Sequence, residues 1–124
     1  MATVSGNLIA ESLRVGTPLE AVKLSVERIS RADVGDVSVG QPRTWTFIEF
    51  HADLHDADGL ATALSAALDP TLGWYCDFRS EDETFVTFAD RVFRYPRGDT
   101  EWRAEVEEYA RSVGVPESQL DWPE

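Results

Sequence analysis

The clearest structural pattern in the chain lies in residues 44–52, TWTFIEFHA, which concentrate β-branched and aromatic side chains. Along this segment the series Trp45, Phe47 and Glu49 alternates with a second series of side chains. Because successive side chains of an extended chain point to opposite faces, this period of two predicts a β-strand. The fold must therefore include a β-sheet.

A helix is expected directly after this strand. Asp56 and Asp58 supply carboxylates for an N-terminal cap, and an apolar stripe at helical spacing follows them. Pro70 cannot continue a helix, so we expect this helix to span about residues 57–69.

Residues 73–96 predict two consecutive β-hairpins. The first strand of this region alternates Trp74, Cys76 and Phe78 with Tyr75, Asp77 and Arg79. Two further strands are expected at residues 84–88 and 92–95, each after a short polar segment. A second helix then follows, with Asp99 or Thr100 as its N-cap and Gly114 at its end.

The N-terminal third is less regular. Residues 6–15 and 20–31 flank a Gly-Thr-Pro turn signal at Gly16, and the second of these segments alternates in the manner of a strand. Thr17 followed by Pro18 also suits the start of a helix, so both interpretations stay open. Residues 33–42 are expected to form a loop, because glycine, proline and aspartate are frequent there.

The resulting order of elements is β-β-β-α-β-β-β-α. This order predicts an α+β fold with a mostly antiparallel sheet and two helices packed on one face of it. No linker divides the chain, so we expect one domain over residues 1–124, with residues 115–124 as a C-terminal tail packed on the body. Domains of this class include enzymes, inhibitors and adaptors, so the fold by itself does not indicate the function.

The charge of the chain is strongly acidic. The 124 residues include 23 acidic and 11 basic side chains, which gives a net charge of −12. Eight acidic residues and two arginines lie within residues 99–124, so the last fifth of the chain carries half of the excess. This balance disfavours binding to nucleic acid or to anionic lipid and favours a partner with a basic surface.

Cysteine and hydropathy patterns indicate the compartment. Cys76 is the only cysteine and cannot form an internal disulfide, as is typical of proteins in a reducing environment. The sequence shows neither a secretory signal nor an apolar stretch long enough to span a bilayer. We therefore expect a cytoplasmic protein.

Catalytic and cofactor motifs are absent from the sequence. Neither GxxxxGK[ST], GxGxxG nor GxSxG occurs, and Cys76 lies at an apolar position that suits the core. His51, Asp53 and His55 are residue types that bind zinc or iron. They lie where a strand ends and a helix begins, however, where solvated acids and caps are ordinary. We expect no metal and no cofactor.

Three arginines, Arg91, Arg94 and Arg97, form the one basic cluster of the sequence. Such a cluster is a possible anion or ligand site. In a chain of this acidity the guanidinium groups more often pair with neighbouring carboxylates, and that is the interpretation we favour.

The leading functional hypothesis is a small acidic, non-enzymatic protein-binding module, such as an inhibitor, an immunity-type protein or an accessory protein. The residues expected to contact a basic partner are Glu101, Glu105, Glu108 and Trp122. The alternative is a small-molecule-binding domain or an enzyme whose polar site assembles only on folding. Its expected members are His51, His55, Asp77 and Arg79. A homodimer is a third possibility.

Overall fold

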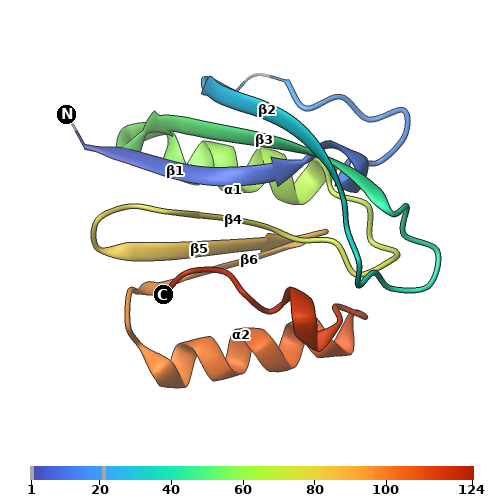
Figure 1. Ribbon diagram of the computed structural model, residues 1–124. Helices are drawn as coiled ribbons and strands as arrows, with labels where there is room; N and C mark the ends of the chain where they lie inside the picture. Colours follow the sequence, from blue (N-terminus) through green and yellow to red (C-terminus); the bar gives the residue numbers. More distant parts are fainter. Residues whose placement is uncertain (1, 21) are drawn as a thin grey trace.

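One antiparallel sheet dominates the computed structural model, which describes residues 2–20 and 22–124. Within this part of the chain the sheet has six strands, and two α-helices pack against it (Figure 1). The strands are β1 (Thr3–Ile9), β2 (Ser25–Asp33), β3 (Thr44–Asp53), β4 (Cys76–Arg79), β5 (Glu83–Phe88) and β6 (Arg91–Pro96). The helices are α1 (Ala57–Ala67) and α2 (Thr100–Ser112). The α+β class and the order of elements expected from the sequence are confirmed.

The first strand of the chain lies in the middle of the sheet. The spatial order is β2-β3-β1-β4-β5-β6, so β1 joins the β2–β3 hairpin to the β4–β5–β6 meander. Gly6 makes the contact between β1 and β4 possible, because a Cβ at this position would lie 2.5 Å from the backbone oxygen of Asp77. The two halves of the sheet therefore meet at a residue without a side chain.

One row of paired residues crosses all six strands and shows that one face of the sheet changes from polar to apolar. The row consists of Arg28, Glu49, Asn7, Asp77, Val86 and Phe93, in the order β2 to β6. Paired residues of neighbouring strands point to the same face. This face is therefore polar across its first four strands and apolar across the last two.

The two helices cover opposite faces of the sheet, and the expectation that both pack on one face is wrong. Phe85 of β5 belongs to the core under α1, whereas the next residue, Val86, packs with Val106 of α2. Residues 84–88 are all buried, because β5 is covered on both sides. In Figure 1, α1 lies behind the strands and α2 lies below them.

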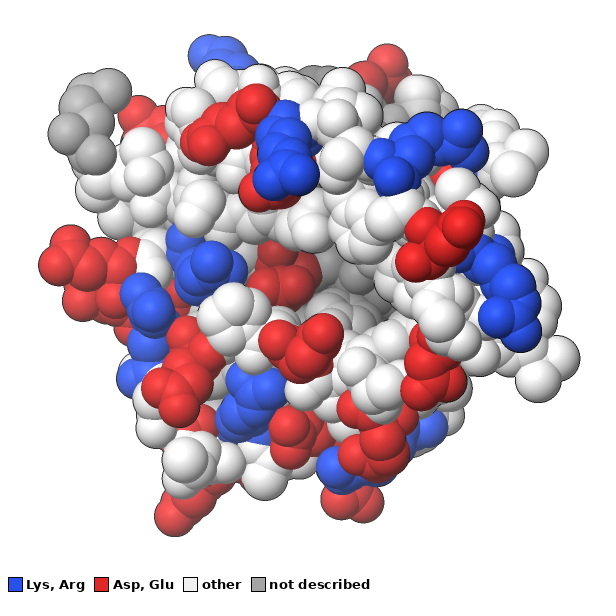
Figure 2. Space-filling model, in the orientation of Figure 1, with Lys and Arg blue, Asp and Glu red and all other residues white. Residues whose placement is uncertain are grey.

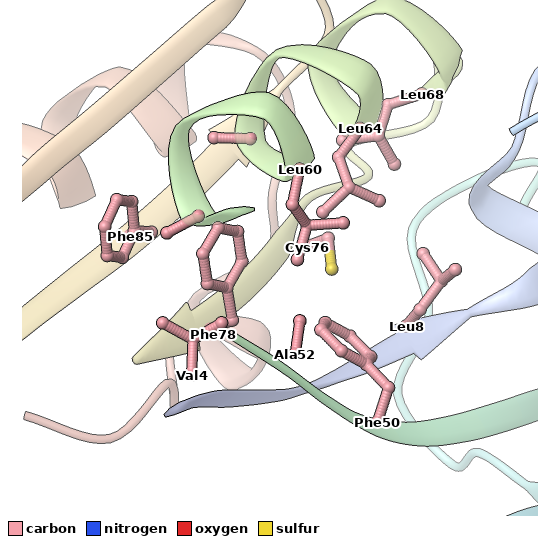
Figure 3. Close-up of a cluster of buried hydrophobic side chains, with 12 residues drawn as sticks. Val4, Leu8, Phe50, Ala52, Leu60, Leu64, Leu68, Cys76, Phe78 and Phe85 are labelled. Atoms are coloured by element: carbon pink, nitrogen blue, oxygen red, sulfur yellow. The ribbon is translucent and has the colours of Figure 1, made fainter. Parts of the chain in front are cut away.

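Each helix has its own hydrophobic core. Figure 3 shows the larger one, in which Leu60 and Leu64 of α1 face Phe78 of β4 and Phe50 of β3. The smaller core lies between α2, strands β5 and β6, and the C-terminal tail, and includes the ring of Trp122. On this face of the sheet, α2 and the tail cover only β5 and β6. The polar part of the same face, on β1 and β3, is therefore not covered by either described helix.

The sheet ends in two irregular edges. At one edge, β2 is exposed along nearly its whole length, and its pairing with β3 shifts between Val26 and Arg28, which places a bulge at Glu27. At the other edge, β6 ends at Pro96 and carries two exposed arginines.

Candidate functional site

A groove crosses the polar half of the sheet, on the face opposite α1. It consists of two adjoining hollows of about 320 Å³ and about 490 Å³, which share Asn7, Asp77 and Asp121 in their linings. Strands β1 and β4 form the floor, and residues of β2 and β3 and the C-terminal tail form the two walls. Figure 2 shows this face hollowed near its centre, with acidic side chains in the hollow and over α2 below it.

The floor of the groove is a consequence of strand register. Asn7 pairs with Glu49 on one side and with Asp77 on the other, so three polar side chains lie next to one another on the same face. The pKa of the Asp77 carboxyl is raised to about 6, chiefly by burial and to a smaller extent by the charge of Asp121, while the charge of Arg79 lowers it. Asp77 is therefore the most strongly desolvated carboxylate of the groove.

One end of the groove is aromatic. Trp45 and Phe47 of β3 and Trp74 and Tyr75 before β4 line the smaller hollow. The rings of Trp45 and Trp74 are 5.2 Å apart between centroids. Trp45 is fixed further by a hydrogen bond of 2.7 Å from its Nε1 to the Pro42 carbonyl. The result is a rigid apolar wall beside the polar floor.

The C-terminal tail forms the second wall and is held by hydrogen bonds along its length. Arg103 of α2 donates to the carbonyls of Trp122 and Leu120, at 2.7 Å and 3.2 Å. The hydroxyl of Tyr75 donates to the Gln119 carbonyl and lies 3.4 Å from a carboxylate oxygen of Asp121. Burial raises the pKa of the Tyr75 phenol, which keeps it protonated as a donor.

Acidic side chains dominate the lining of the groove. Five carboxylates line its two hollows, against one arginine, Arg79. These carboxylates belong to Glu27, Asp36, Glu49, Asp77 and Asp121. Two of them have partners at the rim, since Glu27 contacts His51 and Glu49 forms an ion pair with Arg28 at 3.5 Å. The three carboxylates without an ion pair among the described residues are Asp77 on the floor, Asp121 on the tail and Asp36 in the loop after β2.

The structure separates the residues that the sequence assigned to partner binding. Glu101, Glu105 and Glu108 are exposed on α2 and form no ion pair with the described residues. Trp122, in contrast, is only 3% exposed, and its Nε1 donates a hydrogen bond to the Tyr95 hydroxyl. The expectation that the Trp122 ring contacts a partner is corrected, because that ring belongs to the core.

The three arginines of the possible anion site do not converge. Arg94 pairs with Glu83 and Asp58, and Arg91 lies over the Phe93 ring. Arg97 donates to three backbone carbonyls, at Ser80, Glu81 and Glu124. Only Arg94 pairs with carboxylates, as the sequence interpretation expected, whereas Arg91 contacts aromatic rings and Arg97 contacts backbone carbonyls.

Of the four residues expected to form a ligand or enzyme site, the structure brings only some together. Asp77 and Arg79 both line the groove, and His51 lies at its rim in contact with Glu27. His55 lies elsewhere, in the 3-10 turn Leu54–Asp56, and lines none of the hollows described here. Within the described residues there is no cluster of three or more His, Cys, Asp or Glu side chains suited to a metal ion.

Cys76 is buried in the core under α1. Burial raises the pKa of its thiol well above the ordinary value, so the reactive thiolate is disfavoured. Nucleophilic chemistry at this residue has no support in the structure.

Sequence reasoning missed Asn7, Glu49 and Asp121 as members of one site. Glu49 shares its face of the strand with Trp45 and Phe47, and this charge in an otherwise aromatic series is a signal that the sequence contains. Asn7 and Asp121 are brought to it by the central position of β1 and by the path of the tail, for which the sequence has no local signal.

In the part of the chain that the structure describes, neither α-helix has the length and apolar character needed to cross a membrane. Comparison with family models, with curated proteins and with solved structures finds no significant match to this chain.

Proposed function

We propose that this protein is a small acidic binding module that docks on a basic protein surface through the groove. The observation that carries the proposal is the lining of the groove, where five carboxylates outnumber one arginine. Clefts lined by charge of one sign focus the electric field and attract a partner of the opposite sign. An inhibitor, an immunity-type protein or an accessory protein would work in this way.

The shape of the site also supports a protein partner. A concave polar floor beside rigid aromatic rings resembles the composition of interfaces, in which aromatic side chains provide contact area and charges provide orientation. The exposed carboxylates of Glu101, Glu105 and Glu108 on α2 extend the negative field beyond the groove. Their role in this proposal is to accelerate the encounter, because exposed charges act mainly on association rates.

The experiment is affinity capture from the native cell extract, with the immobilised protein as bait at low and at near-molar salt. We expect a basic protein that is retained at low salt and released at high salt, because screening acts over about 8–10 Å at physiological salt. The captured partner is then purified, and its association rate and Kd are measured with three variants.

The variants distinguish the contribution of the groove to partner binding from that of α2. Asp121→Lys reverses one exposed charge of the groove, and the double variant Glu105→Lys/Glu108→Lys reverses two on α2. The control, Thr62→Lys/Ala66→Lys, adds the same charge as Asp121→Lys on exposed positions of α1, on the opposite face. We expect Asp121→Lys to weaken binding, the α2 variant to slow association, and the control to change little.

Two results would contradict the proposal. The first is a Kd and an association rate that change neither with salt nor with the groove and α2 substitutions. Such a result would show that the acidic face does not contact the partner. A dissociation constant that responds equally to the α1 control and to Asp121→Lys would show a net-charge effect instead of a site. Recovery of a small molecule in place of a protein would favour the ligand-binding alternative.

A further inference from the structure

The groove contains a largely buried carboxylate whose charge is offset only from a distance, by Arg79 and Arg103. Asp77 lies where the two hollows meet, and none of the ion pairs among the described residues involves it. The carboxylate receives no hydrogen bond from another described side chain, although burial has removed much of its water. A desolvated charge without a partner costs free energy. A cation bound from outside the chain would offset that cost.

A second carboxylate lines the same two hollows from the wall that the tail forms. Asp121 belongs to the tail, shares both hollows with Asp77 and raises the pKa of Asp77 through its charge. The phenol of Tyr75 lies between the tail and the floor, 3.4 Å from an Asp121 oxygen. Two carboxylates thus face one space, beside the aromatic end of the groove.

The arginines of the chain are not placed to fill this space. Arg103 is held by Glu107 and by two tail carbonyls, and Arg28 is paired with Glu49 at the rim. Arg79 lines the larger hollow but forms no ion pair with Asp77. The pair of carboxylates therefore remains open to a cation from another molecule.

We propose that Asp77 and Asp121 form the seat for a single arginine side chain, which a protein partner presents in the groove. The inference rests on the proposed function and specifies the residue that the site recognises. A guanidinium is planar, donates two parallel hydrogen bonds to carboxylates and stacks on aromatic rings, whereas the lysine ammonium is a compact and strongly hydrated charge. Carboxylates beside the half-buried ring of Tyr75 match the guanidinium better than the ammonium.

The molecule contains an example of the same chemistry. The Arg103 guanidinium lies 4.6 Å from the centroid of the Trp122 ring while it donates hydrogen bonds to oxygens of the tail. It is the combination of an aromatic face and oxygen acceptors that holds this arginine. The groove offers that combination with stronger acceptors and without an occupant from its own chain.

The test uses short peptides and the full-length protein. Acetyl-Gly-Arg-Gly-amide is titrated against isotope-labelled protein, and backbone amide shifts are followed by NMR. We expect saturable shifts centred on Asn7, Asp77 and Asp121, with a Kd on the order of 1 mM. The citrulline peptide has nearly the same shape without the charge and should bind at least tenfold more weakly. The lysine peptide should bind several-fold more weakly than the arginine peptide.

Two variants place the effect at the seat. Asp77→Asn keeps the shape of the side chain and should weaken arginine binding at least fivefold. Asp58→Asn removes the same charge from α1, on the opposite face, and should change the Kd less than twofold. Folding of both variants is checked from the dispersion of the same NMR spectra.

Several outcomes would overturn the arginine seat. These are equal binding of the citrulline or lysine peptide, shifts that map outside the groove, equal effects of the two variants, or no saturable binding. Tighter binding of free L-arginine than of the peptide would assign the site to a small molecule instead. If the peptide fails while partner binding still depends on Asp121, the arginine assignment is wrong and the proposed function stands. If partner binding does not depend on Asp121 either, both the arginine assignment and the proposed function are wrong.

Discussion

The indole Nε1 of Trp122 donates a hydrogen bond of 2.7 Å to the hydroxyl of Tyr95, and both groups are buried. This bond joins the C-terminal tail to the edge strand β6 inside the smaller core. Tyr95→Phe removes the acceptor and leaves the indole N–H buried without a partner. Such a loss costs about 1–3 kcal/mol of the free energy of unfolding. Urea denaturation followed by circular dichroism measures it.

Tyr109→Phe is the matched control for this substitution. Tyr109 packs in the same core, but its hydroxyl makes no hydrogen bond with the described residues. We expect its removal to change stability by less than about 0.5 kcal/mol, which is ordinary for substitutions away from special features. Equal losses in the two variants would show that the Tyr95 hydroxyl is not a specific partner of Trp122.

The raised pKa of Asp77 predicts that this residue destabilises the protein at neutral pH. The carboxyl pKa rises from the ordinary 3.8 to about 6 on folding, chiefly because of burial. Between these values the folded state binds the proton more tightly than the unfolded state, so this contribution to stability is lost as pH rises from about 4 to about 6. The cost above pH 6 is on the order of 3 kcal/mol.

Asp77→Asn cannot ionise and should therefore be more stable than the natural protein at pH 7, with the difference shrinking toward pH 4. Urea unfolding at a series of pH values measures this convergence. Asp36→Asn, which removes an exposed carboxylate from the same groove, should show no comparable trend. A stability difference for Asp77→Asn that is constant across the series would contradict the burial of this charge.

Gly6→Ala is predicted to separate β1 from β4. The new Cβ would lie 2.5 Å from the Asp77 backbone oxygen and 2.6 Å from the Phe78 Cβ, neither of which moves without the strand. Overpacking of this kind costs about 1–3 kcal/mol. Gly35→Ala, which meets nothing within 4 Å, should cost far less. Equal unfolding midpoints for the two variants would show that the strands can separate freely.

Phe85→Ala tests the core under α1. The side chain is fully buried and stacks on Phe78, with ring centroids 4.6 Å apart. Truncation of a buried phenylalanine costs about 3–5 kcal/mol. Val92→Ala, at a position that is 38% exposed on the neighbouring strand, should cost less than about 1 kcal/mol. Thermal unfolding of both variants provides the comparison.

Local signals in the sequence predicted most of the elements. The alternation in residues 44–52 matches β3, and Asp56 and Pro70 bracket α1, although the Asp56 carboxylate does not make the expected capping hydrogen bond. The spatial order of the strands was not predictable in this way, because β1 pairs with partners at least 38 residues away. The placement of α1 and α2 on opposite faces had one signal, the apolar residues on both faces of β5, which an antiparallel sheet with one covered face does not need.

The candidate site was predictable only in part. Asp77 and Arg79 were identified as polar residues of an alternating strand, and both line the groove. The other carboxylates reach it through the register of β1 and through the hydrogen bonds that fix the tail. These are long-range relationships, and no period or spacing in the chain expresses them.

The irregular edges of the sheet limit how this protein meets copies of itself. An exposed edge offers unpaired backbone groups to any passing strand and can start the growth of fibrils. Here the bulge at Glu27 breaks the spacing of those groups on β2, and Pro96 ends the row on β6. Arg91 adds an exposed positive charge to the second edge, whereas the charge of Arg94 is paired with Asp58 and Glu83. Both features disfavour edge-to-edge pairing between copies of this sheet.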